Sequence, residues 1–125
     1  MRVLYVDDDR INALLFEEIC RLFGGIELQV ADDGAQALEV IAEWAPQVLV
    51  IDLHLPDTSG CELLPQLRQR LAAPTLPAYL CTAEVAEHAT PVAEAAGFTG
   101  CWIKPVTVEH LRTHVQTHAA GQSTP

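Results

Sequence analysis

Hydrophobic and polar positions follow two alternating periods along this chain. Five short apolar runs indicate strands, and five longer segments with apolar residues three or four positions apart indicate helices. The predicted strands cover residues 2–6, 26–30, 47–51, 77–81 and 101–103. The predicted helices cover residues 11–23, a segment around 37–42, and residues 60–71, 84–96 and 107–119. Regular alternation of strand and helix predicts the α/β class, with a doubly wound five-stranded parallel sheet flanked by five helices.

Two of the predicted helices contain a proline. Pro91 lies inside the segment 84–96, where a missing amide donor and a clash with the preceding turn would cost a straight helix about 3 kcal/mol. We expect either a kink at Pro91 or a helix that begins near Thr90. Pro65 poses a milder form of the same problem near the start of the helix 60–71.

The length of 125 residues suits one domain with a buried core. We expect this domain to span residues 1–119, with residues 120–125 as a flexible tail or linker stub. Half of the residues are hydrophobic, yet no apolar run approaches the roughly 18 residues of a membrane span, and no charged-then-apolar leader opens the chain. The sequence therefore predicts a soluble, cytoplasmic domain without membrane contact.

The net charge and the cysteine spacing argue against nucleic-acid binding and against a zinc site. A net charge of −10, from 7 basic and 17 acidic residues, argues against direct binding of nucleic acid, which needs a basic face. Four cysteines lack the paired spacing of a zinc site and are expected to be reduced packing residues. These are Cys20, Cys61, Cys81 and Cys101.

Four of the five histidines are expected on the solvated surface, namely His88, His110, His114 and His118.

Aspartates follow two of the predicted strands at the point where each strand ends. Asp7, Asp8 and Asp9 come directly after the first strand, and Asp52 follows the third. Because the carboxyl ends of parallel strands meet at one edge, these carboxylates should lie together and repel one another unless a cation holds them. An all-oxygen site suits Mg²⁺, with Mn²⁺ as the alternative. In a competing interpretation Asp8 or Asp9 only caps the next helix, which accounts for one aspartate of three.

Two more polar side chains occupy strand ends. Thr82 closes the fourth strand with a hydroxyl, and Lys104 closes the fifth with an ammonium group. Either residue alone is more often structural or solvated. Here, however, four strands end at the same edge of the sheet, two with carboxylates, one with a hydroxyl and one with an ammonium group. Their combination predicts a single functional crevice.

With these motifs in order, the chain resembles the receiver domain of bacterial two-component response regulators over residues 2–119. The matching motifs are VLYVDDDRINALLFEE, VIDLHLPDTSG, CTAE and WIKP. The first two resemble receivers that are appended to hybrid sensor histidine kinases. The resemblance implies that Asp52 is the phosphoacceptor and that Thr82 and Lys104 contact the phosphoryl group. It also implies an Mg²⁺ site formed by Asp8, Asp52 and the backbone carbonyl of His54, with Asp7 acting through water.

The resemblance further implies partners and a switch. A histidine kinase or a histidine phosphotransfer protein would donate the phosphoryl group, and no independent substrate turnover is expected. Phosphorylation would pull Thr82 inward and rearrange the surface of the fourth helix and fifth strand. A homodimer through the fourth helix, fifth strand and fifth helix is one expected consequence. The downstream effector, the cognate kinase and the phosphate lifetime are not indicated, nor is a stand-alone receiver distinguished from one excised from a longer chain.

The chain departs from the family at one position that matters for switching. Cys101 stands where receivers usually carry a tyrosine or phenylalanine, and Trp102 should point to the opposite face of the strand. His54 and Glu84 occupy positions that in the family modulate the rate of phosphate removal, although they also fit exposed loop residues.

Three other functions compete with a phosphorylated receiver. A degenerate receiver would act only as a docking module. A small Mg²⁺-dependent phosphatase of the haloacid dehalogenase type would use the D-x-D pattern of Asp7 to Asp9, but it needs an acidic pair after Lys104 and a longer chain. A flavodoxin-like cofactor binder would need a phosphate loop rich in serine, threonine or glycine after the first strand, where this chain has three anions.

Overall fold

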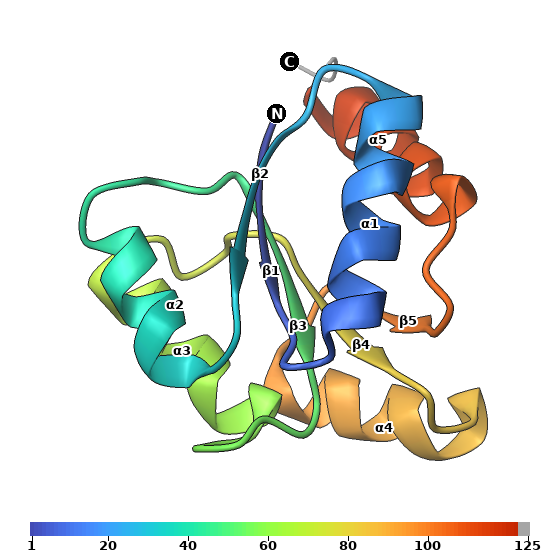
Figure 1. The fold of residues 1–125 in the computed structure, drawn as a ribbon. Helices are drawn as coiled ribbons and strands as arrows, with labels where there is room; N and C mark the ends of the chain where they lie inside the picture. The colour runs from blue at the N-terminus through green and yellow to red at the C-terminus, as the bar shows by residue number, and fades with distance from the viewer. Residues whose placement is uncertain (123–125) are drawn as a thin grey trace.

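The computed structural model describes the backbone of residues 1–122 and the side chains of residues 1–116. Strands and helices alternate strictly along the chain (Figure 1). The strands are β1 (Arg2–Val6), β2 (Glu27–Ala31), β3 (Val48–Asp52), β4 (Ala78–Thr82) and β5 (Gly100–Ile103). The helices are α1 (Arg10–Phe23), α2 (Gly34–Ile41), α3 (Gly60–Arg70), α4 (Ala86–Ala96) and α5 (Val108–Gln122). The predicted five-plus-five α/β architecture is confirmed.

All strand pairs are parallel, and the sheet order is β2-β1-β3-β4-β5. Helices α1 and α5 cover one face, and α2, α3 and α4 cover the other (Figure 1). The chain moves outward from β1 to β2 and then returns to place β3 on the other side of β1. This reversal puts a topological switch point at the carboxyl ends of β1 and β3, the edge at which open α/β sheets form their ligand crevice.

The core has two layers because side chains alternate across each strand. Val3 and Tyr5 of β1 pack on the α1 and α5 side, whereas Leu4 and Val6 pack on the other. β3 repeats this alternation with four buried residues from Val48 to Ile51. Burial on both faces explains why these strands are continuous apolar runs in the sequence.

Three strands lie one residue further along the chain than expected. The predicted 26–30, 47–51 and 77–81 are observed as β2, β3 and β4. Pairing with neighbouring strands sets these limits, since Asp52 pairs with Cys81 and Thr82 with Ile103. Asp52 and Thr82 therefore belong to the sheet itself and not to the loops that follow it.

Both prolines lie inside continuous helices. α4 begins at Ala86 and runs through Pro91, so the expected alternative of a helix that begins near Thr90 is wrong, and the other alternative, a kink at Pro91, stays a prediction. The turn before the proline forms normally, because the amides of His88 and Ala89 both donate to Val85 O. α3 runs through Pro65 in the same way. Each proline removes only one amide donor, and the buried faces of both helices keep them in place.

Two expectations for the C-terminal part need correction or remain open. α5 continues to Gln122, past the expected helix end at 119, so residues 120–122 of the expected tail are helical. Residues 123–125 lie outside the described chain.

His114 is not on the solvated surface, since it is 4% exposed and its Nδ1 lies 2.7 Å from the Tyr79 hydroxyl. His110 is half-buried against Trp102, and His88 is exposed as expected. The side chain of His118 is outside the described part.

The cysteines behave as packing residues. All four are free thiols, and Cys20 and Cys81 are buried while Cys61 and Cys101 are half-buried. Burial raises the pKa of both buried thiols to about 12, so neither is a ready nucleophile. Among the described residues, no helix has the length and apolar character that crossing a membrane requires.

Candidate functional site

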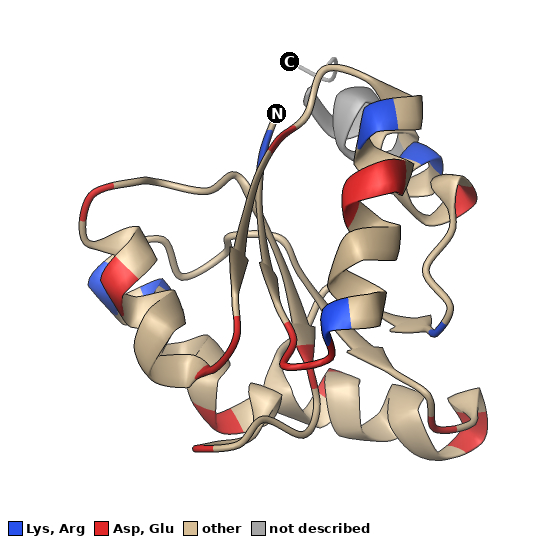
Figure 2. Cartoon of the chain, viewed as in Figure 1, with Lys and Arg blue, Asp and Glu red and all other residues tan. Residues whose placement is uncertain are grey.

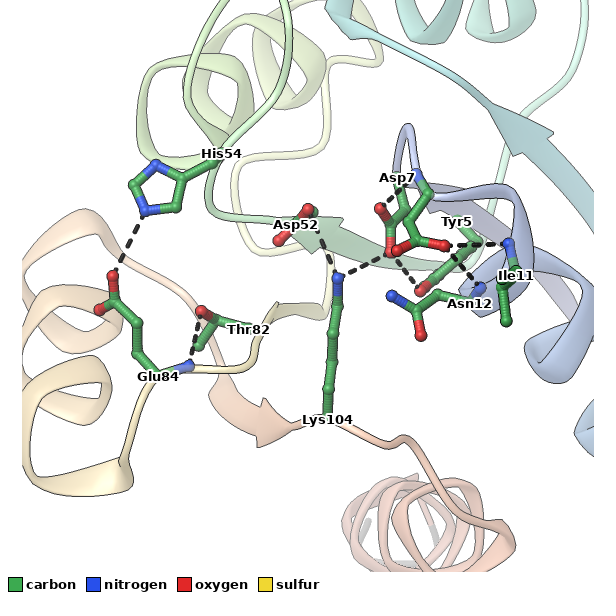
Figure 3. Close-up of polar contacts among 10 residues, drawn as sticks. Tyr5, Asp7, Ile11, Asn12, Asp52, His54, Thr82, Glu84 and Lys104 are labelled. Carbon is green, nitrogen blue, oxygen red and sulfur yellow. Dashed lines mark hydrogen bonds and ion pairs between the residues drawn. The ribbon is translucent and has the colours of Figure 1, made fainter.

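The crevice collects polar side chains from four neighbouring strand ends (Figure 3). Asp7 directly follows β1, and Asp52 ends β3. Thr82 ends β4, and Lys104 directly follows β5. The order β1-β3-β4-β5 in the sheet makes these strand ends adjacent, so residues far apart in the sequence share one rim.

Three carboxylates form the centre of the site. Asp7, Asp8 and Asp52 each offer an oxygen within 4.8 Å of the others. Asp7 is 1% exposed, Asp52 is half-buried and Asp8 is exposed. Such a set repels itself in a poorly solvated place, and its oxygen-only chemistry fits a hard divalent cation. The sequence-predicted acids that would hold Mg²⁺ are therefore brought together.

Lys104 lies between two of these acids. Its Nζ is 2.9 Å from Asp7 Oδ2 and 3.5 Å from Asp52 Oδ2, and its side chain is only 13% exposed. Burial by itself would lower the pKa of Lys104, but the hydrogen bond and charges of Asp7 and Asp52 raise it above its ordinary value. Burial raises the pKa of Asp52 to about 6; Lys104 opposes that shift and Asp7 adds to it. The ammonium thus serves as an internal counterion of the acid cluster.

The three consecutive aspartates have two different roles. Asp7 and Asp8 point into the cluster, whereas Asp9 is the N-cap of α1. One Asp9 oxygen accepts hydrogen bonds from the amides of Ile11 at 2.9 Å and Asn12 at 3.1 Å. The capping interpretation is therefore correct for Asp9 and leaves the other two aspartates for the site.

Asp7 has two further hydrogen-bond donors. The Tyr5 hydroxyl donates to Asp7 Oδ2 at 2.7 Å, and the Asp9 amide donates to Asp7 Oδ1 at 2.9 Å. Burial raises the pKa of Tyr5 well above its ordinary value, and the neighbouring Cys81 and Asp7 add to the shift, so the phenol keeps its proton. Sequence reasoning missed Tyr5, although its position two residues before Asp7 places both side chains on one side of the strand.

The loop after Asp52 is tightly constrained. Its backbone is closed by Leu55 N donating to Thr58 O at 3.1 Å and Gly60 N donating to Leu53 O at 2.9 Å. A Cβ on Gly60 would lie 2.5 Å from the carbonyl oxygen of Asp52, so only glycine fits this close approach. The loop that carries the His54 carbonyl, the predicted third metal ligand, therefore has a fixed backbone.

Asp57 ties this same loop to α2. Its two carboxylate oxygens accept hydrogen bonds from the amides of Gly34 at 2.9 Å and Ala35 at 3.0 Å. These bonds lower the pKa of Asp57, and the bond from Gly34 is the larger cause. A Cβ on Gly34 would lie 2.7 Å from Thr58 Cγ2, which shows how closely the two segments approach. This contact was also missed, because no periodic pattern links residues 23 positions apart.

His54 and Glu84 face each other at the mouth of the crevice (Figure 3). His54 Nε2 lies 3.3 Å from Glu84 Oε1, and their side chains are 77% and 44% exposed. The pair joins the loops after β3 and β4. Its effect on the rate of phosphate removal stays a prediction.

Thr82 is almost fully buried at 3% exposure. Its Oγ1 accepts a hydrogen bond from the Glu84 amide at 3.2 Å. A hydroxyl that accepts in this way still has its own proton to donate. Thr82 therefore keeps one donor available at the crevice.

The residues of β5 point to opposite faces, as expected. Trp102 is buried on the α5 side, stacked between Tyr79 at 4.4 Å and His110 at 5.2 Å between ring centroids. Cys101 packs against the layer on the other face. Trp102 therefore cannot replace the aromatic side chain that position 101 lacks.

Comparison with known proteins places the chain in one family. A family model described as the response regulator receiver domain matches residues 3–116. The chain is 30% identical over 106 residues to the autoinducer 2 sensor kinase/phosphatase LuxQ of Vibrio harveyi, covering 85% of this chain and 12% of that protein. It is 32% identical over 117 residues to response regulator MprA of Mycobacterium leprae, covering 93% and 50%.

Comparison of the fold with solved structures points to the same family. The chemotaxis response regulator CheY4 of Vibrio cholerae superposes with a TM-score of 0.80 at 26% identity, covering 93% of this chain and 96% of that one. The chain spans only a small part of LuxQ and half of MprA, so those larger proteins contain much that this chain does not. The acid pair, the strand-end aspartate, the threonine and the lysine all lie within the matched residues. This chain belongs to the response regulator receiver domain family of two-component signalling.

Proposed function

We propose that Asp52 accepts a phosphoryl group from a phosphohistidine in an Mg²⁺-dependent reaction, and that the phosphorylated site then switches conformation. One observation carries this proposal. Asp52 lies in a cluster of three carboxylates, and the ammonium of the half-buried Lys104 is 3.5 Å from its Oδ2. A lone strand-end aspartate would need neither the other acids nor the cation.

The proposed metal ligands are Asp8, Asp52 and the backbone carbonyl of His54, with Asp7 contributing through water. Mg²⁺ is the first choice and Mn²⁺ the alternative, because all these ligands are oxygen atoms. When bound, the ion would neutralise the charge of the incoming phosphoryl oxygens and make attack by a carboxylate tolerable.

Three residues of the chain then have separate roles in the transfer. An oxygen of Asp52 forms the new bond to phosphorus, while the bond from phosphorus to the donor imidazole breaks and its electron pair stays on that imidazole. Lys104, already beside Asp52, pairs with an oxygen of the new acyl phosphate. Thr82 donates its free hydroxyl proton to another oxygen. Both contacts exist only after transfer, so they favour a second conformation of the domain.

The surroundings of the crevice suit a protein donor. Four exposed large hydrophobic residues lie on α1, and three of them, Ile11, Leu14 and Leu15, are in the half of the helix next to Asp8. Acidic residues occur in several loops at the carboxyl ends of the strands (Figure 2). They include Asp8, Asp9, Asp32, Asp33, Asp57 and Glu84. A histidine kinase or histidine phosphotransfer protein with an apolar contact surface and basic residues around its phosphohistidine would fit.

The remaining parts of the proposal depend on family membership. The domain expected at residues 1–119, whose last helix α5 continues to Gln122, lies in the cytoplasm and turns over no independent substrate. A degenerate docking module would have no use for the ion-paired acid cluster, and the haloacid dehalogenase alternative loses its support to the family match. Homodimer formation through α4, β5 and α5 stays a prediction.

Metal removal tests the reaction directly. Wild-type protein incubated with acetyl phosphate and Mg²⁺ should gain the mass of one phosphoryl group, measured by intact-mass spectrometry. Chelation of the metal should prevent the gain, because three carboxylates repel an anionic donor. Equal labelling with and without metal would contradict the proposal.

Mg²⁺ should also stabilise the fold. At ten times its dissociation constant, a ligand that binds only the native state adds about 1.4 kcal/mol, which raises the melting temperature by roughly 5 °C in a domain of this size. Asp8→Asn should respond much less, because it removes a direct ligand. No response of wild type at tens of millimolar Mg²⁺ would refute the metal site.

Variants of α1 test the donor surface. Ile11→Ser combined with Leu15→Ser should slow phosphotransfer from a protein donor about tenfold or more, since apolar anchors of an interface contribute over 1 kcal/mol each. Labelling by acetyl phosphate should stay within about twofold of wild type, because that donor needs no docking surface. Leu22→Ser is the matched control, because Leu22 is 72% exposed on the same helix but lies about 16 Å along it from Ile11 and about 10 Å from Leu15, on the side away from the crevice. Equal loss in the control would contradict this docking surface.

A further inference from the structure

A buried phenol lies directly beneath the acid cluster. Tyr5 is 1% exposed, and its ring stacks on Phe16 with the centroids 4.5 Å apart. The stacking fixes the ring, so the hydroxyl has a defined position. That hydroxyl donates to Asp7 Oδ2 at 2.7 Å (Figure 3).

The Asp7 carboxylate is held from three directions. Oδ2 accepts from both the Tyr5 hydroxyl and Lys104 Nζ, the latter at 2.9 Å, and Oδ1 accepts from the Asp9 amide at 2.9 Å. Asp7 is 1% exposed, so bulk water has little access to replace a lost donor. The orientation of this carboxylate therefore depends on these three groups.

Only one of the three donors changes its partner in the proposed reaction. The Asp9 amide belongs to the backbone and stays where it is, whereas Lys104 turns to the phosphoryl group. Without Tyr5, Asp7 Oδ2 would then be a buried anionic oxygen with no donor, which is costly. The Tyr5 hydroxyl prevents this, because it remains on Oδ2 when Lys104 leaves.

We propose that Tyr5 is a positioning residue of the metal site. Its hydroxyl holds the Asp7 carboxylate in the orientation that ion binding requires, and it keeps Asp7 Oδ2 satisfied when Lys104 moves. This inference rests on the proposed function, because it assumes that Asp7 serves a bound Mg²⁺. Hydrogen bonds that orient metal ligands in this way typically contribute about 10- to 100-fold in metal affinity.

The chain offers a matched pair of variants, since Tyr5 and Tyr79 are its only two tyrosines. Both are buried and both use their hydroxyl, but Tyr79 contacts His114 Nδ1 at 2.7 Å, away from the acids. Isothermal titration calorimetry with Mg²⁺ should show about tenfold or weaker binding by Tyr5→Phe than by wild type. Tyr79→Phe should stay within about twofold of wild type, although it too loses a buried hydrogen bond and with it some thermal stability.

A second measurement needs no variant. Incorporation of 3-fluorotyrosine gives two fluorine NMR signals in the wild-type chain, one for each tyrosine. Titration with Mg²⁺ should shift the Tyr5 signal, with the midpoint that calorimetry gives, and leave the Tyr79 signal in place. This readout remains available if Tyr5→Phe does not fold.

The outcomes separate two failures. If wild type binds Mg²⁺ and Tyr5→Phe binds it equally well, or the Tyr5 signal does not move at saturation, the role of Tyr5 is wrong while the metal site stands. If wild type itself shows no Mg²⁺ binding, the proposed metal site and the role of Tyr5 both fail.

Discussion

Asp52→Asn should leave the protein unable to gain a phosphoryl group from acetyl phosphate and Mg²⁺, whereas wild type gains one. An amide is not a nucleophile at neutral pH, and it also removes one anionic metal ligand, so the expected loss is complete. Intact-mass spectrometry measures the gain. In wild type the product should be stable in acid and labile in base, as an acyl phosphate is.

Asp9→Asn is the matched control for this substitution. Asp9 directly follows Asp8 in the sequence but lies outside the metal cluster, and asparagine caps a helix about as well as aspartate. The control should therefore label like wild type and keep the stability of α1. An equal mass gain in Asp52→Asn would place the phosphoacceptor elsewhere.

The conformational switch should act mainly through the backbone after β4. Beryllofluoride with Mg²⁺, which imitates the phosphoryl group, should draw the Thr82 hydroxyl away from the Glu84 amide and move residues 82–84. The segment around Pro91 should follow, because a helix with one amide donor fewer has less to break when it shifts. The rotamer of Cys101 should stay largely unchanged.

The reason lies in the two faces of β5. Cys101 is small, so at about 25 cal/mol per Å² its two orientations differ little in buried apolar area. Trp102 is 5% exposed and stacked between two rings, which fixes it. Neither side chain can do what a swinging tyrosine does. The phosphorylated site should therefore be coupled to the surface of α4 through Thr82.

Paired structures with and without beryllofluoride test this switch. Thr82→Ala should still gain the phosphoryl group at Asp52 but lose the movement of α4, whereas Thr82→Ser, which keeps the hydroxyl, should retain it. A large reorientation of Cys101 or Trp102 beside a static α4 would contradict the mechanism.

The sequence predicted the architecture because both of its periods are strong. Continuous apolar runs identified β1 and β3, and the acids after them predicted a cluster that the geometry brings together. Strand limits were off by one residue, since the register of Asp52 depends on pairing with Cys81, which no local pattern encodes.

Contacts between distant segments explain the other differences. His114 looked like a surface residue of a helix, but Tyr79 lies 35 positions earlier and offers its hydroxyl there. The bonds from Asp57 to α2 also depend on how two loops meet. Local patterns predict elements and strand ends, whereas partners across the fold require the assembled structure.

The position of Lys104 has a consequence for which ion the crevice selects. Three ionised carboxylates beside one ammonium group leave an excess of two negative charges. A divalent cation balances that excess completely, while a monovalent cation leaves half of it in a poorly solvated place. Selection of Mg²⁺ over a monovalent cation would then follow from the charge balance as well as from the size of the ion. Without Lys104 the same three acids would still carry a negative charge after binding Mg²⁺, and a phosphoryl donor would meet a repulsive site.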